Sequence, residues 1–211
     1  MIKGIIFDLD GVLCSTDEYH YQAWKKLADR LGIYFDRKIN DRLRGVSRMD
    51  SLEIVLERAE KAYSDEEKLA FAAEKNDTYR ALLSRMSPAD LSDEVKKTLD
   101  ELRRRGYRMS LGSSSKNSKY ILERIGLGGY FDAISDGTNI TRSKPDPEVF
   151  LKAAEFLSLP PEECLVVEDA EAGIRAAKAG GMAAAGIGEA RTFALTDYPL
   201  DRFSELLNVL P

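Results

Sequence analysis

The sequence predicts an α/β fold, a Rossmann-like parallel-sheet core interrupted by an inserted helical bundle. Short apolar, β-branched or small-residue runs recur along the chain with helical patterns between most of them, which is typical of parallel strands joined by crossover helices. These runs cover residues 5–7, 109–111, 133–134, 165–167 and 183–187. Residues 15–87 contain helical patterns but no convincing strand. We therefore expect a core domain from residues 1–14 and 88–211, and a helical cap domain from residues 15–87.

Composition limits the possible functions. The chain has 211 residues, 44% of them hydrophobic, which is enough for a sizeable core. Its net charge of -5 argues against nucleic acid or an anionic membrane as the main partner. No apolar run approaches the ~20 residues of a spanning helix. Because a strand is predicted directly at the first residues, we expect no signal peptide. We expect a cytoplasmic monomer, with Cys14 and Cys164 as reduced thiols near opposite edges of the sheet.

The inserted segment is expected to form four helices. Serines followed three residues later by glutamate predict two capping boxes, Ser15 with Glu18 and Ser64 with Glu67. A third serine, Ser47, is expected to cap a helix over about residues 49–59. The chain would enter and leave this segment through hinges at residues 13–16 and 87–90.

The helices expected in the core have recognisable ends. Ser92 can cap a helix that Gly106 terminates, and Asp146-Pro147 reads as an N-cap followed by proline at the first helical position. The expected helices cover residues 92–105, 117–125, 147–157, 170–179 and 201–209.

The first strand runs directly into Asp8-Leu9-Asp10-Gly11. Residues i and i+2 of an extended chain point to the same side, so Asp8 and Asp10 can converge where the strand ends, with Leu9 on the other face. Ligands of open α/β sheets bind at that edge, and a hard cation such as Mg²⁺ would supply the counter-charge. The alternative is a strand followed by an acidic turn.

Three further polar segments follow predicted strands or precede helices. The serine-rich segment Ser113 to Asn117 offers hydroxyls, backbone N–H groups and a helix start for an oxyanion. Lys144 is held extended by Pro145 and could present a fixed cation. Glu168-Asp169 would be costly beside Asp8 and Asp10 unless a cation is shared. Alone, the serine segment is more often a capped helix and Lys144-Pro145 an ordinary loop, and Glu168-Asp169 is equally compatible with a solvated helix start.

Taken in order, these segments resemble the haloacid dehalogenase (HAD) superfamily over the entire chain. The resemblance implies a HAD-like core with strand order 5-4-1-2-3. It implies that Asp8 is a nucleophile forming an aspartyl phosphate and that Asp10 is the general acid and base. Ser113 and Lys144 would hold the transferring phosphoryl oxygens. Mg²⁺ would be held by Asp8, Glu168, Asp169 and the main-chain carbonyl of Asp10.

The inserted segment resembles the sugar-phosphate mutases of that superfamily that act on β-glucose 1-phosphate. The matching positions are Thr16, His20, Gly45 to Ser51, Lys75 to Asp77, Ser87 to Asp90 and Ser115 to Asn117. Two positions depart from the family, since Arg44 stands where Lys is common and Ser15 replaces an Asp.

This second resemblance implies residue roles in the cap. The non-transferring phosphate would be held by Arg48, Ser115, Lys116 and Asn117, and the sugar would contact Gly45, Val46 and Lys75, with Arg44 also binding substrate. Thr16 and His20 would belong to the catalytic site at the hinge. His20, the only histidine, is expected to hydrogen-bond cap and core groups and not a metal, although a lone histidine is more often structural. Trp24 is expected to be core packing.

The reaction follows from the second phosphate clamp. A bisphosphate intermediate must present either end to Asp8, whereas a monophosphatase needs no second anion site. We therefore expect interconversion of β-D-glucose 1-phosphate and glucose 6-phosphate through β-glucose 1,6-bisphosphate, with Mg²⁺ as cofactor and a small phosphorylated sugar as partner. The alternatives are a sugar-phosphate phosphatase on the same scaffold and a receiver-like phospho-aspartate switch.

Overall fold

A computed structural model describes residues 1–44 and 46–210 of the chain. Within them a sheet of six parallel strands has the order β3-β2-β1-β4-β5-β6. The strands are β1 (Gly4–Phe7), β2 (Arg108–Gly112), β3 (Ala133–Ser135), β4 (Cys164–Glu168), β5 (Ala183–Gly186) and β6 (Tyr198–Pro199). The first five have the expected 5-4-1-2-3 order. The sequence did not predict β6, because a two-residue edge strand shows no periodicity.

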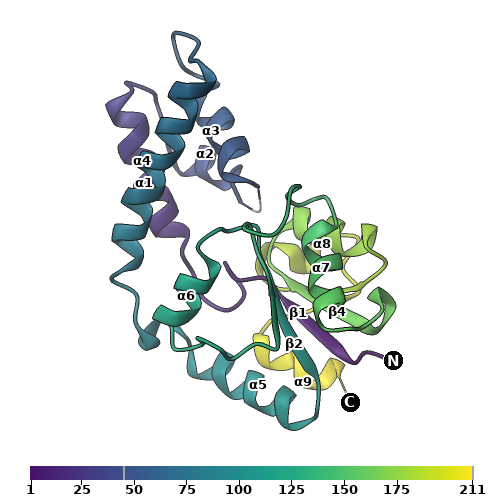
Figure 1. Ribbon diagram of the computed structural model, residues 1–211. Helices are drawn as coiled ribbons and strands as arrows, with labels where there is room; N and C mark the ends of the chain where they lie inside the picture. Colours follow the sequence, from purple (N-terminus) through teal and green to yellow (C-terminus); the bar gives the residue numbers. More distant parts are fainter. Residues whose placement is uncertain (45, 211) are drawn as a thin grey trace.

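Helices cover both faces of the sheet (Figure 1). The helices of the core are α5 (Asp93–Arg104), α6 (Ser118–Arg124), α7 (Glu148–Phe156), α8 (Glu171–Ala179) and α9 (Leu206–Val209). Short 3₁₀ turns are η1 (Pro88–Asp90), η2 (Pro161–Glu163), η3 (Gly188–Thr192) and η4 (Phe203–Glu205). Ser92 caps α5 as expected, accepting from the N–H of Val95.

Two expected core helices need correction. Pro147 occupies the N-cap position of α7, so the helix begins one residue later than predicted. Asp146 still serves its start, because its carboxylate accepts from the N–H of Glu148 at 2.9 Å. The single helix expected over residues 201–209 is wrong, because the segment divides into η4 and α9. The ring of Phe203 turns inward to pack 5.8 Å from that of Phe7 before the α-helix begins.

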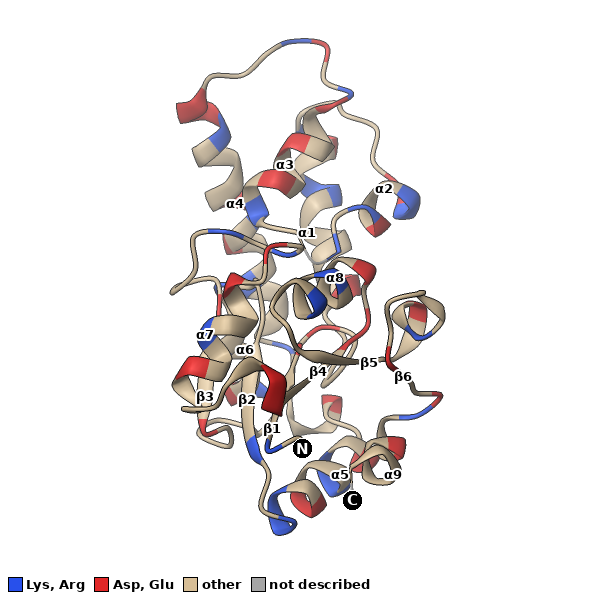
Figure 2. Cartoon of the chain, turned by 90° about the vertical axis from the view of Figure 1, so that its right-hand side faces the viewer, with Lys and Arg blue, Asp and Glu red and all other residues tan. Residues whose placement is uncertain are grey.

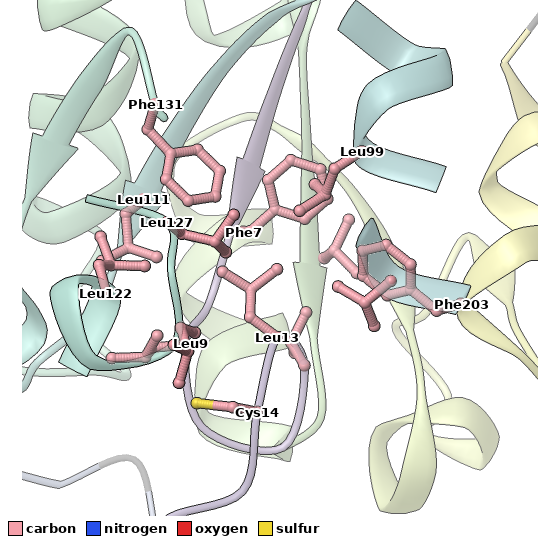
Figure 3. Close-up of a cluster of buried hydrophobic side chains, with 14 of the residues drawn as sticks. Phe7, Leu9, Leu13, Cys14, Leu99, Leu111, Leu122, Leu127, Phe131 and Phe203 are labelled. Atoms are coloured by element: carbon pink, nitrogen blue, oxygen red, sulfur yellow. The ribbon is translucent and has the colours of Figure 1, made fainter. Parts of the chain in front are cut away.

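Strand side chains alternate between two buried clusters. Phe7 and Leu111 face the side covered by α5, α6 and α9 (Figure 3). Ile6 and Val166 face the side covered by α7 and α8. Because the central strands are buried on both faces, they read as continuous apolar runs and not as alternating ones.

The described residues between 17 and 83 form four helices that we call the cap. They are α1 (Asp17–Arg30), α2 (Arg37–Asp41), α3 (Arg48–Leu56) and α4 (Asp65–Leu83). The cap has an apolar cluster of its own that includes Trp24, as expected, and Figure 1 shows it lying beyond the sheet. The Ser64–Glu67 capping box is present, and Ser47 caps α3. The domain boundaries at 14/15 and 87/88 stay a prediction.

The predicted capping box of Ser15 and Glu18 is wrong. Helix α1 begins at Asp17, so its N-cap residue is Thr16, which makes no side-chain capping bond. The Thr16 hydroxyl instead donates to the carboxylate of Asp10. The carboxylate of Glu18 accepts from Gln22 and Arg37. Ser15 thus lies one residue before the N-cap, and Glu18 bonds to side chains of Gln22 and Arg37 instead of closing a capping box.

The cysteines, the charged residues and the hydrophobicity of the helices complete the description of the fold. Cys14 and Cys164 are buried free thiols, as predicted. Basic and acidic residues are interspersed over the helices of cap and core (Figure 2). Across residues 1–44 and 46–210, no helix has both the length and the hydrophobicity needed to cross a membrane.

Candidate active site

The site lies where β1 and β4 end side by side. Phe7 pairs with Val167 in register, and the N–H of Asp8 donates to the carbonyl of Val167 at 3.0 Å. This pairing brings Asp8 beside the two acids that follow Val167. Carboxylate oxygens of Asp8, Glu168 and Asp169 all lie within 4.8 Å of one another.

A single buried ammonium group bridges two of these acids. Lys144 Nζ lies 2.5 Å from Asp8 Oδ1 and 2.5 Å from Glu168 Oε1. Burial would lower the pKa of Lys144, but Asp8 and Glu168 raise it above its ordinary value. The side chain therefore carries a fixed positive charge next to Asp8, as the sequence predicted.

One lysine does not balance three carboxylates. Burial, the largest effect, raises the pKa of Asp8 to about 7. Burial, followed by the charge of Glu168, raises the pKa of Asp169 to about 8. Such a set of hard oxygen donors with excess negative charge fits Mg²⁺. The residues placed to hold it are Asp8, Glu168 and Asp169.

Glycines leave room for these carboxylates. Gly11 has φ +78°, and a Cβ at that position would lie 2.0 Å from Asp169 Oδ2. A Cβ at Gly173 in α8 would lie 1.9 Å from Glu168 Oε1. Any side chain would displace the acids, which explains the glycine of Asp8-Leu9-Asp10-Gly11. Gly173, which the sequence analysis missed, could have been found only from the close approach of α8 to the site.

The carboxylate of Asp10 lies outside this cluster, which corrects the expectation that both aspartate side chains converge on one cation. It accepts from Thr16 Oγ1, and Thr16 Oγ1 in turn accepts from Tyr79 Oη at 2.9 Å. Burial raises the pKa of Asp10. The acid is therefore tied through Thr16 to cap helix α4. The sequence analysis missed Tyr79, whose only signal is its position one turn after Lys75.

His20 and Lys75 meet inside the cap. Lys75 Nζ lies 2.9 Å from His20 Nδ1 and 4.7 Å from the centre of the Trp24 ring. Burial lowers the pKa of both groups. The charge of Lys75 lowers the pKa of His20 further, and the charge of the half-buried Arg48 lowers the pKa of both groups. His20 thus bonds within the cap, and its predicted bond to a core group is absent from the hydrogen bonds of the described residues.

The loop after β2 is built from serine hydroxyls. Ser113 Oγ accepts from the N–H of Ser115, and Ser115 Oγ accepts from the N–H of Asn117, each at 3.2 Å. Ser113 is buried beside the end of β1, and Lys116 is exposed. The amide of Asn117 bonds to cap helix α4, donating to Asn76 Oδ1 at 3.0 Å and accepting from Arg80 at 3.1 Å. The loop therefore joins core and cap.

Arg44 reaches from the cap to the core. Its guanidinium lies 3.3 Å from Asp17, 3.6 Å from Asp41 and 3.3 Å from Glu189 of η3. Val46 is half-buried, and Gly45 lies outside the described residues. The predicted sugar contacts of this segment stay predictions.

Comparison with known proteins identifies the scaffold. A family model described as haloacid dehalogenase-like hydrolase matches residues 2–181. The chain belongs to this family. It is 42% identical to β-phosphoglucomutase of Bacillus subtilis, over 97% of this chain and 92% of the relative. It is 33% identical to fructose-1-phosphate phosphatase YqaB of Escherichia coli, over 85% of this chain and 93% of the relative.

A solved structure agrees with the sequence relationship. The crystal structure of β-phosphoglucomutase from Clostridium difficile superposes with a TM-score of 0.92 at 37% identity, covering 98% of this chain and 93% of that one. Both resemblances inferred from the motifs, to the HAD superfamily and to mutases of β-glucose 1-phosphate, are therefore confirmed.

Proposed function

We propose that the protein is a Mg²⁺-dependent β-phosphoglucomutase that acts as a monomer. The observation that carries the proposal is the loop from Ser113 to Asn117. It begins beside Asp8 and ends bonded to cap helix α4, so one loop can serve a phosphate at Asp8 and a second phosphate toward the cap. The half-buried Arg48 offers that second phosphate a guanidinium suited to bidentate binding.

The chemistry divides between the two aspartates. Phospho-Asp8 transfers its phosphoryl group to the 6-hydroxyl of β-glucose 1-phosphate, and Asp10 takes the proton of that hydroxyl. After the bisphosphate turns around, Asp8 accepts the 1-phosphoryl group and Asp10 returns the proton to the departing O1, which releases glucose 6-phosphate. Lys144 and Ser113 stabilise the negative charge on the transferring phosphoryl oxygens.

Magnesium, when bound by Asp8, Glu168 and Asp169, would neutralise the repulsion between the Asp8 carboxylate and the incoming phosphoryl group. The cap would exclude water from phospho-Asp8, because hydrolysis would destroy the intermediate. The Thr16 and Tyr79 hydroxyls link Asp10 to the cap. A movement of the cap can therefore change the position of Asp10, the group that transfers the proton.

A sugar-phosphate phosphatase is the second candidate, favoured by the 33% identity to a fructose-1-phosphate phosphatase. In that case water takes the place of the sugar hydroxyl at phospho-Asp8. The same Asp8, Asp10 and Lys144 serve both reactions, so only the acceptor distinguishes them.

The deciding experiment measures glucose 6-phosphate formation and phosphate release side by side, with and without added bisphosphate. We expect bisphosphate-stimulated turnover of β-glucose 1-phosphate, little turnover of the α-anomer, and loss of turnover in Asp10→Asn with Mg²⁺ binding retained. Predominant phosphate release would establish the phosphatase. A stable phosphoprotein without turnover would indicate a receiver-like switch, and light scattering checks the monomer.

A further inference from the structure

We propose that Arg80 is a positioning residue for substrate, holding the Asn117 amide as a hydrogen-bond donor toward the non-transferring phosphate. The inference rests on the proposed function, because it assumes that Asn117 binds that phosphate. The structural relationship behind it joins a cap side chain, Arg80 of α4, to a core side chain at the start of α6.

The Asn117 side chain is diverted from its local role. An asparagine at an N-cap position normally accepts from an N–H of the first helical turn. Asn117 is the N-cap of α6 but makes no such bond. Its Oδ1 accepts from Arg80 at 3.1 Å, and its Nδ2 donates to Asn76 Oδ1 at 3.0 Å. The buried amide is therefore engaged in tertiary contacts with α4 and not in capping α6.

These bonds fix which end of the amide can meet an anion. Phosphate oxygens only accept, so Asn117 must offer Nδ2–H. The Nδ2 group has two hydrogens, and Asn76 takes one of them. Because Arg80 occupies Oδ1, the amide cannot turn this oxygen toward a phosphate, and the second Nδ2 hydrogen stays available. Without Arg80, Oδ1 is free to cap α6, and the donor leaves the anion site.

The Arg80 guanidinium has no competing carboxylate. No acidic group among the described residues lies within ion-pair distance of it, and it packs 4.7 Å from the ring centre of Tyr120 in α6. By contrast, Arg44 is engaged by three acids. The positive charge of Arg80 therefore stays available to polarise Asn117 beside an anion.

Arg80 also sits where the cap is anchored. The guanidinium of Arg124 in α6 donates to the carbonyls of Ser84 and Met86 at 2.7 and 2.5 Å. Ser84 is one helical turn beyond Arg80, and its N–H donates to the carbonyl of Arg80. Because the end of α4 is fixed to α6, the Arg80–Asn117 contact can persist while the rest of the cap moves.

The test compares Arg80→Ala, Arg80→Lys and Asn117→Ala with the double variant. Arg85→Ala is the matched control, since Arg85 is an exposed arginine five residues along the same segment. KM and kcat are measured with β-glucose 1-phosphate. The binding of inorganic phosphate is measured by calorimetry, and the melting temperature of each variant is measured alongside. We expect Arg80→Ala to raise KM about tenfold with kcat within about twofold and the melting temperature unchanged. Arg80→Lys should recover part of the loss, and Arg85→Ala should behave as wild type.

The coupling between the Arg80 and Asn117 substitutions distinguishes a positioning role of Arg80 from direct contact of Arg80 with the phosphate. If Arg80 acts through Asn117, the double variant is no worse than Asn117→Ala alone. Additive effects on KM, or an unchanged KM in Arg80→Ala, would overturn the proposal. Calorimetry with inorganic phosphate keeps this outcome separate from the mutase assignment, because it measures anion binding without requiring turnover of any sugar phosphate.

Discussion

Lys144 Nζ lies 2.5 Å from Asp8 Oδ1, and the two side chains are almost completely buried. The same ammonium group contacts Glu168 at 2.5 Å. Asp8, which is placed to receive the phosphoryl group, is thus held by Lys144, the cation placed to stabilise the negative charge of that group. Removing the cation leaves two carboxylates without a positively charged partner in a low-dielectric environment.

Lys144→Met should therefore destabilise the metal-free protein by about 3–5 kcal/mol, the range for breaking a buried pair, and abolish turnover. Urea unfolding measures the change. The control is Lys3→Met, because Lys3 pairs with Glu163 at 2.7 Å at an exposed position and should cost about 1 kcal/mol or less. Equal losses in the two variants would contradict a special role for the buried pair.

Magnesium should stabilise the fold increasingly as pH rises. The pKa values of about 7 for Asp8 and about 8 for Asp169 lie above the ordinary value of 3.8. Between about pH 4 and 8 the folded metal-free protein therefore binds more protons than the unfolded chain, and its unfolding free energy falls as pH increases. Mg²⁺ binds the ionised carboxylates and offsets that loss.

Thermal unfolding with and without Mg²⁺ at pH 5.5 and pH 8 checks this expectation. The Mg²⁺-induced rise in melting temperature should be larger at pH 8 and should nearly vanish in Asp169→Asn. Asp93→Asn is the control, since Asp93 is exposed at the start of α5. A Mg²⁺ effect independent of pH would refute the argument.

Tyr79→Phe should lower kcat about tenfold while leaving the fold intact. The Tyr79 hydroxyl donates to Thr16 Oγ1, which donates to Asp10, so its loss frees Thr16 to rotate away from the acid. The buried hydrogen bond contributes about 0.5–1.5 kcal/mol to stability. Steady-state kinetics measure the effect. Tyr34→Phe is the control, because Tyr34 is exposed and its hydroxyl donates to Asp36, away from the site. An unchanged kcat would exclude Tyr79 from positioning Asp10.

Local sequence patterns predicted what depends on local physics. The strand order agrees with what the resemblance to the HAD superfamily implied. The alternation of strands and helices, the Ser92 and Ser64 caps and the cluster of Asp8 with Glu168 and Asp169 follow from apolar runs and from polar residues placed where strands end. These features need no knowledge of how distant helices pack.

Contacts between cap and core could not be predicted in this way. The Ser15–Glu18 box is absent because Thr16 is the N-cap of α1, and the Thr16 hydroxyl bonds to Asp10 and Tyr79 instead of capping the helix. The partnership of Asn117 with Arg80 joins residues 37 positions apart. The hydrophobic periodicity of α4 identifies its buried face. It does not reveal which loop of the core the residues on its other faces contact.

The ion pair of Arg44 with Glu189 illustrates this class of contact and yields the last prediction. Arg44 is expected to bind substrate, yet its guanidinium lies 3.3 Å from Glu189 of η3. Substrate must compete with that carboxylate. An exposed pair contributes about 0.2–1 kcal/mol, so Glu189→Ala should lower KM for β-glucose 1-phosphate by about 1.4- to 5-fold.

Kinetics at low and high salt provide the measurement, because screening weakens an exposed pair. The advantage of Glu189→Ala over wild type should shrink as salt is added, and Arg44→Ala should raise KM. In the double variant, the benefit of removing Glu189 should vanish, since it acts through Arg44. Glu60→Ala, which removes an exposed acid elsewhere in the cap, is the matched control. A lower KM that survives in the Arg44→Ala background would show that Glu189 repels the substrate directly and does not compete for Arg44.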